Sequence, residues 1–203
     1  MRKCLKRVSI CFLAAAMVWL GMLITDRNTL RTELVRLHVV ADSDSQADQA
    51  LKFRVRDAVN ESLKREMANL TDPAEARQYL QENLPKIEAL ANRVLREAGC
   101  GDVATVRLQA EAFTARVYDT FTLPAGIYDA LRITIGSGQG QNWWCVVFPA
   151  LCYGASEEEF EEIAGCAGLS DGLVHTLEGK EGYEIRFYLL DLIGRMENLL
   201  YRG

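Results

Sequence analysis

The chain has 203 residues, of which 49% are hydrophobic and 25% are charged, a composition typical of a globular protein with one good core or two small ones. Its formal net charge is −5, but four of its 23 basic residues lie within the first seven positions, which leaves 19 basic against 28 acidic residues, or −9, in residues 8–203. An acidic body without clustered lysine and arginine cannot follow a nucleic-acid backbone, so nucleic acid is excluded as a partner.

An apolar leader opens the chain. Residues 8–24 are 17 positions without a charged side chain, directly after the basic residues. This length is at the lower limit for spanning a bilayer and slightly long for the core of a signal peptide. We expect residues 1–26 to be a signal or anchor segment, uncleaved or slowly cleaved, that contacts the membrane through residues 8–24 if it is retained. Because basic flanks stay cytoplasmic, residues 27–203 should form a single extracytoplasmic domain.

A strand, a polar turn and a helix follow the leader. Side chains alternate over residues 36–41 as in a strand with two unlike faces. Every side chain of the turn Asp42–Ser45 can bind the backbone, and Ser45 with Asp48 three positions later forms a shortened capping box. The apolar residues that follow recur at every fourth position, which predicts a core-facing helix over residues 46–67.

A second helical segment is marked by strong start and stop signals. Asp72 is a suitable N-cap, Pro73 suits the first helical position, and an apolar stripe continues to Gly99. Pro85 should kink this helix or split it in two. Two or three helices therefore separate the first strand from the next.

Strands resume at Asp102, where the apolar period changes from helical spacing to two. Further strands are predicted over residues 116–123, 128–135 and 142–148. The last two flank the glycine-rich loop 136–141, so we expect them to pair as a hairpin. The loop is not a phosphate-binding loop, because a strand and not a helix follows it.

The C-terminal quarter is predicted to be helical at both ends. A short acidic helix should run from Ser156 to about Ala164, followed by a loop over residues 165–182. A terminal amphipathic helix from Glu184 to Tyr201 should pack on the sheet through its apolar stripe, which consists of Ile185, Leu189, Leu192, Ile193, Met196 and Leu199. The sequence therefore predicts an α+β fold: a membrane leader, a strand, two or three helices, an antiparallel sheet of about three further strands with a hairpin, and C-terminal helices.

The chain offers little support for catalysis. It has two histidines, and His175 falls in the predicted loop. His38 lies close in sequence to Asp42, Ser43 and Asp44, but helix capping already explains those residues, and no hydrolase or zinc motif accompanies them. We expect no enzymatic activity, cofactor, metal or small-molecule substrate. The alternative is a cell-envelope hydrolase that uses His38 with Asp42 or Asp44.

Four of the six cysteines, at positions 100, 145, 152 and 166, lie in the exported part. An oxidising compartment permits disulfides, and Cys145 and Cys152 could pair if the chain reverses at Phe148–Pro149. Alternatively, Cys145 is a small hydrophobic residue of the core.

Three blocks carry a resemblance to a known family. They are RLHVVADSDSQADQALKFRVRD from Arg36, PAGIYDALR from Pro124, and GQNWWCVVFPALC from Gly140, the last being the most specific. In this order and spacing they resemble the family of stage II sporulation protein R, a secreted signalling protein of endospore-forming bacteria.

The resemblance implies synthesis in the forespore, export to the intermembrane space, and activation of a membrane-embedded aspartic protease in the mother-cell membrane that processes pro-sigma-E. Such a ligand needs a recognition surface, which we expect to combine the turn, the start of the next helix and the hairpin edge. Exposed aromatic residues usually dominate such surfaces. The predicted partner-binding residues are His38, Asp42, Ser43, Asp44, Gln49, Lys52, Arg56, Tyr128, Arg132, Asn142, Trp143 and Trp144.

Overall fold

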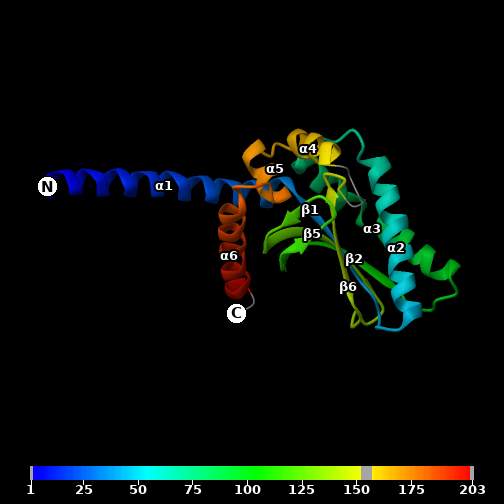
Figure 1. The fold of residues 1–203 in the computed structure, drawn as a ribbon. Coiled ribbons are helices and arrows are strands. Elements are labelled where there is room, and N and C mark those ends of the chain that lie inside the picture. Colours follow the sequence, from blue (N-terminus) through cyan, green and yellow to red (C-terminus); the bar gives the residue numbers. More distant parts are fainter. Residues whose placement is uncertain (1, 152–156, 202–203) are drawn as a thin grey trace.

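The computed structural model describes residues 2–151 and 157–201, which form six helices and six strands (Figure 1). In chain order these are α1 (Arg2–Glu33), β1 (Val35–Val40), α2 (Gln46–Glu66), α3 (Pro73–Glu97), β2 (Ala104–Phe113), β3 (Arg116–Val117), β4 (Thr122–Leu123), β5 (Gly126–Ile135), β6 (Asn142–Phe148), α4 (Glu157–Cys166), α5 (Asp171–Glu178) and α6 (Glu184–Tyr201). The α+β class is as predicted.

The main sheet has the strand order β2-β5-β1-β6. The first strand β1 lies inside it, parallel to β5 and antiparallel to β6. The predicted hairpin is therefore wrong: β1 separates β5 from β6, and the glycine-rich loop passes over its end. All six residues of β1 are buried, so both of the unlike faces that its alternating sequence predicts are covered.

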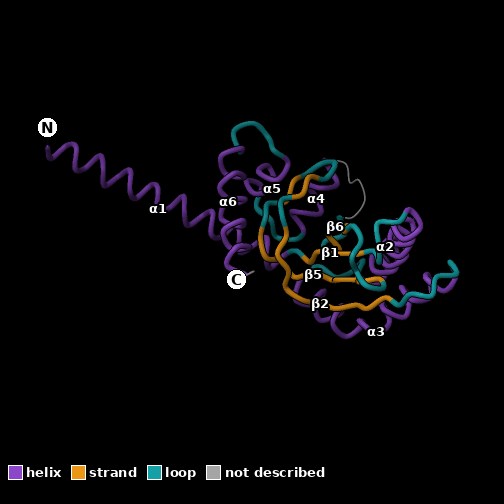
Figure 2. Tube along the Cα trace, turned by 90° about the horizontal axis from the view of Figure 1, so that it is seen from below, coloured by secondary structure: helices purple, strands orange, loops and turns teal. Residues whose placement is uncertain are grey.

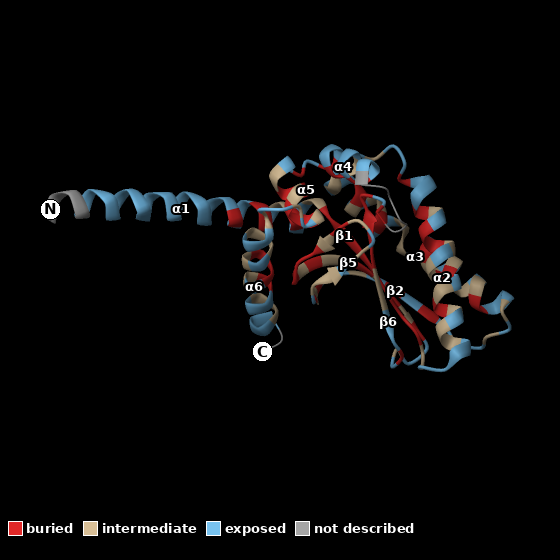
Figure 3. Cartoon of the chain, viewed as in Figure 1, coloured by how far each residue is buried: buried red, intermediate tan, exposed pale blue. Residues whose placement is uncertain are grey.

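Helices cover both faces of the sheet (Figures 1 and 2). Helices α2 and α3 pack on one face over the alternate side chains Val35, Leu37 and Val39 of β1. The end of α1 with α4, α5 and α6 covers part of the other face, around Tyr128 and Val146. Buried residues follow the sheet and the inner sides of the helices, whereas most of α1 is exposed (Figure 3).

The helix starts are largely those that the sequence predicts. The Ser45 side chain accepts a hydrogen bond from the Asp48 amide at the start of α2, and Asp72 caps α3 with Pro73 in its first turn. Helix α3 continues through Pro85, so it is one helix and not two.

The C-terminal region differs from the prediction in two ways. The expected loop contains helix α5, which Ser170 caps at its start and the left-handed Gly179 ends, so His175 lies on a helix. Helix α6 has the predicted bounds, but much of its apolar stripe is exposed, including Ile185, Met196 and Leu199. The residues that α6 buries are Leu190, Asp191 and Gly194.

The segment predicted as one strand over residues 116–123 folds back on itself. It forms the two short strands β3 and β4, paired antiparallel in a sheet of their own. This small hairpin brings Arg116 toward Trp144 on the main sheet, with the guanidinium carbon 3.5 Å from the ring centroid.

Candidate partner-binding surface

The turn after β1 is bound to the glycine-rich loop. Asp42 Oδ1 accepts a hydrogen bond from the Ser137 amide at 2.5 Å, and Asp44 Oδ1 accepts one from the Gln141 amide at 2.7 Å. A Cβ on Gly140 would lie 2.3 Å from the Ser43 carbonyl oxygen, so only glycine fits there. The polar residues of this turn thus have a structural use beyond helix capping.

Lys52 and Gln49, predicted from the sequence as partner-binding residues at the start of the helix, also support this loop. The Gln49 side-chain amide donates to the Ser43 carbonyl at 2.8 Å, and Lys52 Nζ donates to the Gln141 carbonyl at 3.1 Å. Lys52 is buried, and burial, reinforced by the charge of Arg56, lowers its pKa. Lys52 is therefore part of the scaffold and not of the exposed surface.

The two adjacent tryptophans lie on opposite faces of β6, and both are half-buried. Trp143 packs edge-on against Phe53 of α2, with the Arg56 guanidinium carbon 4.4 Å from its ring centroid. On the other face, Trp144 stacks on His38 with ring centroids 5.5 Å apart, and the Arg116 guanidinium also lies over the Trp144 ring. Strand β6 is an edge strand with an arginine–tryptophan stack on each face.

His38 belongs to a polar network on the same face as Trp144. Its Nδ1 lies 2.6 Å from Glu111 Oε2 and its Nε2 lies 2.7 Å from Asn142 Oδ1. The other carboxylate oxygen of Glu111 accepts from Arg132 Nη1 at 3.1 Å and from Gln109 Nε2 at 2.8 Å. The network joins all four strands of the sheet.

The charge of Glu111 is maintained by its partners. Burial opposes ionisation of this carboxyl group, but hydrogen bonds from His38, Arg132 and Gln109 outweigh it and hold the pKa of Glu111 below its ordinary value. Neither Glu111 nor Arg116 is among the residues predicted from sequence. The sequence shows Glu111 only as one polar position on the wet face of a strand, and the register that sets it beside His38 is not visible locally.

The pairing that the hydrolase alternative requires does not form. His38 contacts Glu111 and Asn142, whereas the carboxylates of Asp42 and Asp44 bind loop amides. Both imidazole nitrogens of His38 are held by partners from other strands. The arrangement is that of a structural crosslink beneath Trp144.

Tyr128 and Arg132, both on β5, differ in how far they are buried. Tyr128 is buried in the core, where its hydroxyl donates to the Pro124 carbonyl at 2.9 Å, and burial raises its pKa to about 12. Its position removes it from any exposed surface. Arg132 lies four residues further along on the same face, and its side chain is a third exposed.

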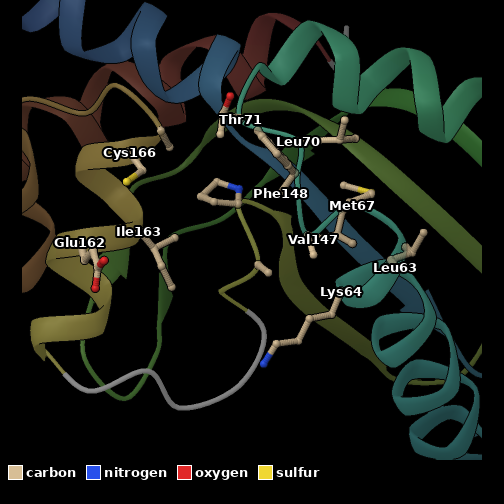
Figure 4. A pocket seen from close by; sticks show the side chains of 14 residues that line it. Leu63, Lys64, Met67, Leu70, Thr71, Val147, Phe148, Glu162, Ile163 and Cys166 are labelled. Carbon is tan, nitrogen blue, oxygen red and sulfur yellow. The ribbon is translucent and has the colours of Figure 1, made fainter.

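An apolar pocket of about 260 Å³ opens where the end of α2 meets α4 and the end of β6 (Figure 4). Its walls include Leu63, Met67, Phe148 and Ile163.

Cys145 of β6 is buried and disulfide-bonded. Cys152 lies outside the described residues, so the pairing of these two cysteines stays a prediction.

Known proteins resemble this chain over most of its length. Residues 31–158 match the family model of stage II sporulation protein R. The stage II sporulation protein R of Bacillus subtilis (strain 168) is 31% identical over 179 residues, covering 79% of this chain and 80% of that relative. No solved structure matches. The range matched by the family model contains all six strands and both arginine–tryptophan stacks.

Proposed function

Because the chain belongs to the stage II sporulation protein R family, whose role is in sporulation, we propose that it is the exported signal that activates a membrane-embedded aspartic protease in the mother-cell membrane. The forespore makes it, the apolar α1 directs it out of the cytoplasm, and the folded domain acts in the intermembrane space. The activated protease then processes pro-sigma-E. The observation that carries this proposal is the family match over residues 31–158, together with a helix in α1 long and apolar enough to cross a membrane.

We place the contact with the protease along the edge of β6. The edge-strand surface, as we call it, consists of the two arginine–tryptophan stacks and the polar side chains beside them: Arg56 and Trp143 on one face, and Arg116, Arg132, Asn142 and Trp144 on the other. The predicted surface residue His38 is buried and lies beneath this surface. Tryptophan and arginine are the residues that most often dominate binding energy. Here each arginine already stacks on its indole, so less side-chain freedom is lost on binding.

The surface also has a rigid base. The His38–Glu111–Arg132 network fixes the face beneath Trp144, and the loop contacts of Asp42, Asp44 and Lys52 fix the start of β6. The predicted turn residues therefore support the surface instead of forming it. This division separates residues whose loss should reduce binding from those whose loss should reduce stability.

The test is to express the chain with the protease and its substrate and to measure pro-sigma-E cleavage. Trp143→Ala and Trp144→Ala should each weaken binding by about 2 kcal/mol or more, roughly thirtyfold, so that cleavage requires correspondingly more protein. Val117→Ala, at a position that is 82% exposed and outside the surface, is the matched control.

Two outcomes would count against the proposal. If both tryptophan variants unfold like the parent and also support cleavage like the parent, the contact lies elsewhere. If pro-sigma-E is cleaved equally well without this protein, the signalling role itself is wrong.

A further inference from the structure

Helix α6 turns an apolar face outward, whereas a helix of a soluble domain turns its apolar face toward the core. Its outer stripe, defined as Ile185, Tyr188, Leu192, Met196 and Leu199, is exposed, with Ile185 at 69% and Leu199 at 75%. These positions are three or four residues apart and form one continuous face. Side chains of this size and spacing normally face a core.

Three charged residues of α6, Arg186, Asp191 and Glu197, bind groups elsewhere in the molecule instead. Arg186 binds Asp26 of α1 at 2.6 Å, and Glu197 binds Arg27 of α1. Asp191 accepts from the Ala125 amide at 2.8 Å and from Arg195 at 2.7 Å. Gly194 packs directly on the chain before β5, where a Cβ would lie 1.7 Å from the Ala125 carbonyl oxygen. These contacts fix which side of α6 faces outward.

The same ion pairs set how α6 lies relative to α1. Asp26 and Arg27 are adjacent on α1, but their partners Arg186 and Glu197 are eleven residues apart, about 16 Å along α6. The two helices therefore cross instead of running alongside each other. Figures 1 and 2 show α6 at the end of the body from which α1 projects.

This crossing occurs where the apolar surface of α1 ends. The large apolar side chains of α1 from Val8 to Ile24 are exposed except for Leu23, whereas Asp26 and Arg27 are buried against the body. If α1 enters a bilayer, its apolar run places the bilayer surface close to Ile24, directly beside α6. A helix that crosses α1 at this level lies along the membrane surface.

We propose that α6 is an interfacial helix, whose outer stripe is buried among the lipids of the membrane that α1 enters. Apolar and tyrosine side chains on one face are typical of helices in this layer, and Arg195, exposed at the flank, suits lipid phosphates. A soluble partner or a second copy would have to reach the stripe from the side that the bilayer occupies. The domain is then held against the membrane by two elements, and its orientation is fixed. This inference does not depend on which protein the domain signals to.

The experiment uses the full chain, reconstituted in vesicles of phosphatidylcholine and phosphatidylglycerol, with lipids brominated near the headgroup as a short-range fluorescence quencher. Trp19→Phe removes the tryptophan inside the span and is the parent. Leu192→Trp adds a reporter on the outer stripe. Gln81→Trp adds a matched exposed reporter on α3, which covers the opposite face of the sheet.

Brominated lipid should quench the added fluorescence of Leu192→Trp at least twofold more than that of Gln81→Trp. Equal quenching would overturn the proposal. A second result would also overturn it: Leu192→Trp fluorescence that is blue-shifted but not quenched, and whose blue shift is lost when added lipid lowers the density of protein in the vesicles. A second copy of the chain would then cover the stripe. If Leu192→Trp unfolds more readily than the parent, Tyr188→Trp serves as the reporter, with the same outcomes.

Discussion

Replacing Glu111 with glutamine tests the polar network beneath Trp144. Glutamine keeps the size of the side chain but removes the negative charge that faces His38 and Arg132, and it presents an amide N–H₂ to at least one donor. Removing one partner of a buried ion pair costs about 3–5 kcal/mol, and Arg132 is a third exposed, so we expect a loss near 3 kcal/mol. With a urea slope of about 3 kcal/mol per molar, the unfolding midpoint should fall by about 1 M.

The assay is urea unfolding of the full chain in mild detergent, followed by tryptophan fluorescence, because Trp144 stacks on His38. The pKa of Glu111 is depressed in the folded state, so its contribution is fully present above the ordinary value of 4.5 and is lost as pH falls through the lower folded value. The gap between parent and Glu111→Gln should therefore narrow below pH 4.5. Glu82→Gln, at an exposed position on α3, is the control and should change stability by less than about 0.5 kcal/mol. A gap under about 1 kcal/mol at pH 7, or one that is unchanged at pH 3, would refute this account of the network.

Three further predictions follow from single contacts. Gly194→Ala should lower the free energy of unfolding by about 3 kcal/mol or more, seen as a drop in urea midpoint, because its methyl group would overlap backbone; a stable variant would show that α6 can shift. Asp44→Ala should lower the free energy of unfolding by about 1–3 kcal/mol and speed hydrogen exchange at the Gln141 amide, which loses its acceptor; an amide that stays protected in the variant would contradict this. Lys86→Met should raise the pKa of Glu66 from about 2, where the hydrogen bond from Lys86 is the largest cause, and an unchanged carboxyl titration by NMR would contradict this.

The sequence predicts local structure well because its signals are local. The capping residues Ser45 and Asp72 act on amides two or three positions away, and helical periodicity fixes the bounds of α6. Strand pairing depends on contacts between distant segments. A glycine loop between two strands normally predicts a hairpin, and nothing within residues 128–148 shows that β1 lies between them.

Periodicity also identifies an apolar face without saying what covers it. The helical spacing of apolar residues in α6 predicts packing on the sheet, yet the ion pairs of Arg186 and Glu197 leave much of that stripe facing outward. The candidate surface shows the same limit. The paired tryptophans are recognisable from sequence, but the burial of Tyr128 and Lys52, and the arrival of Arg116 over Trp144, depend on tertiary packing.

The central position of β1 has a consequence for timing. In the export that we propose, this strand would leave the cytoplasm early, yet both of its neighbours in the sheet come much later in the chain, since Val35 pairs with Asp129 and Phe148. At a synthesis rate of about 5–20 residues per second, roughly 110 residues take on the order of 5–20 s to follow. Until then the sheet cannot close, and the edge of β6 with its two tryptophans does not exist. Under the proposed function, a chain halted partway through translocation would therefore be silent, and the folded domain would report that its own passage across the membrane is complete.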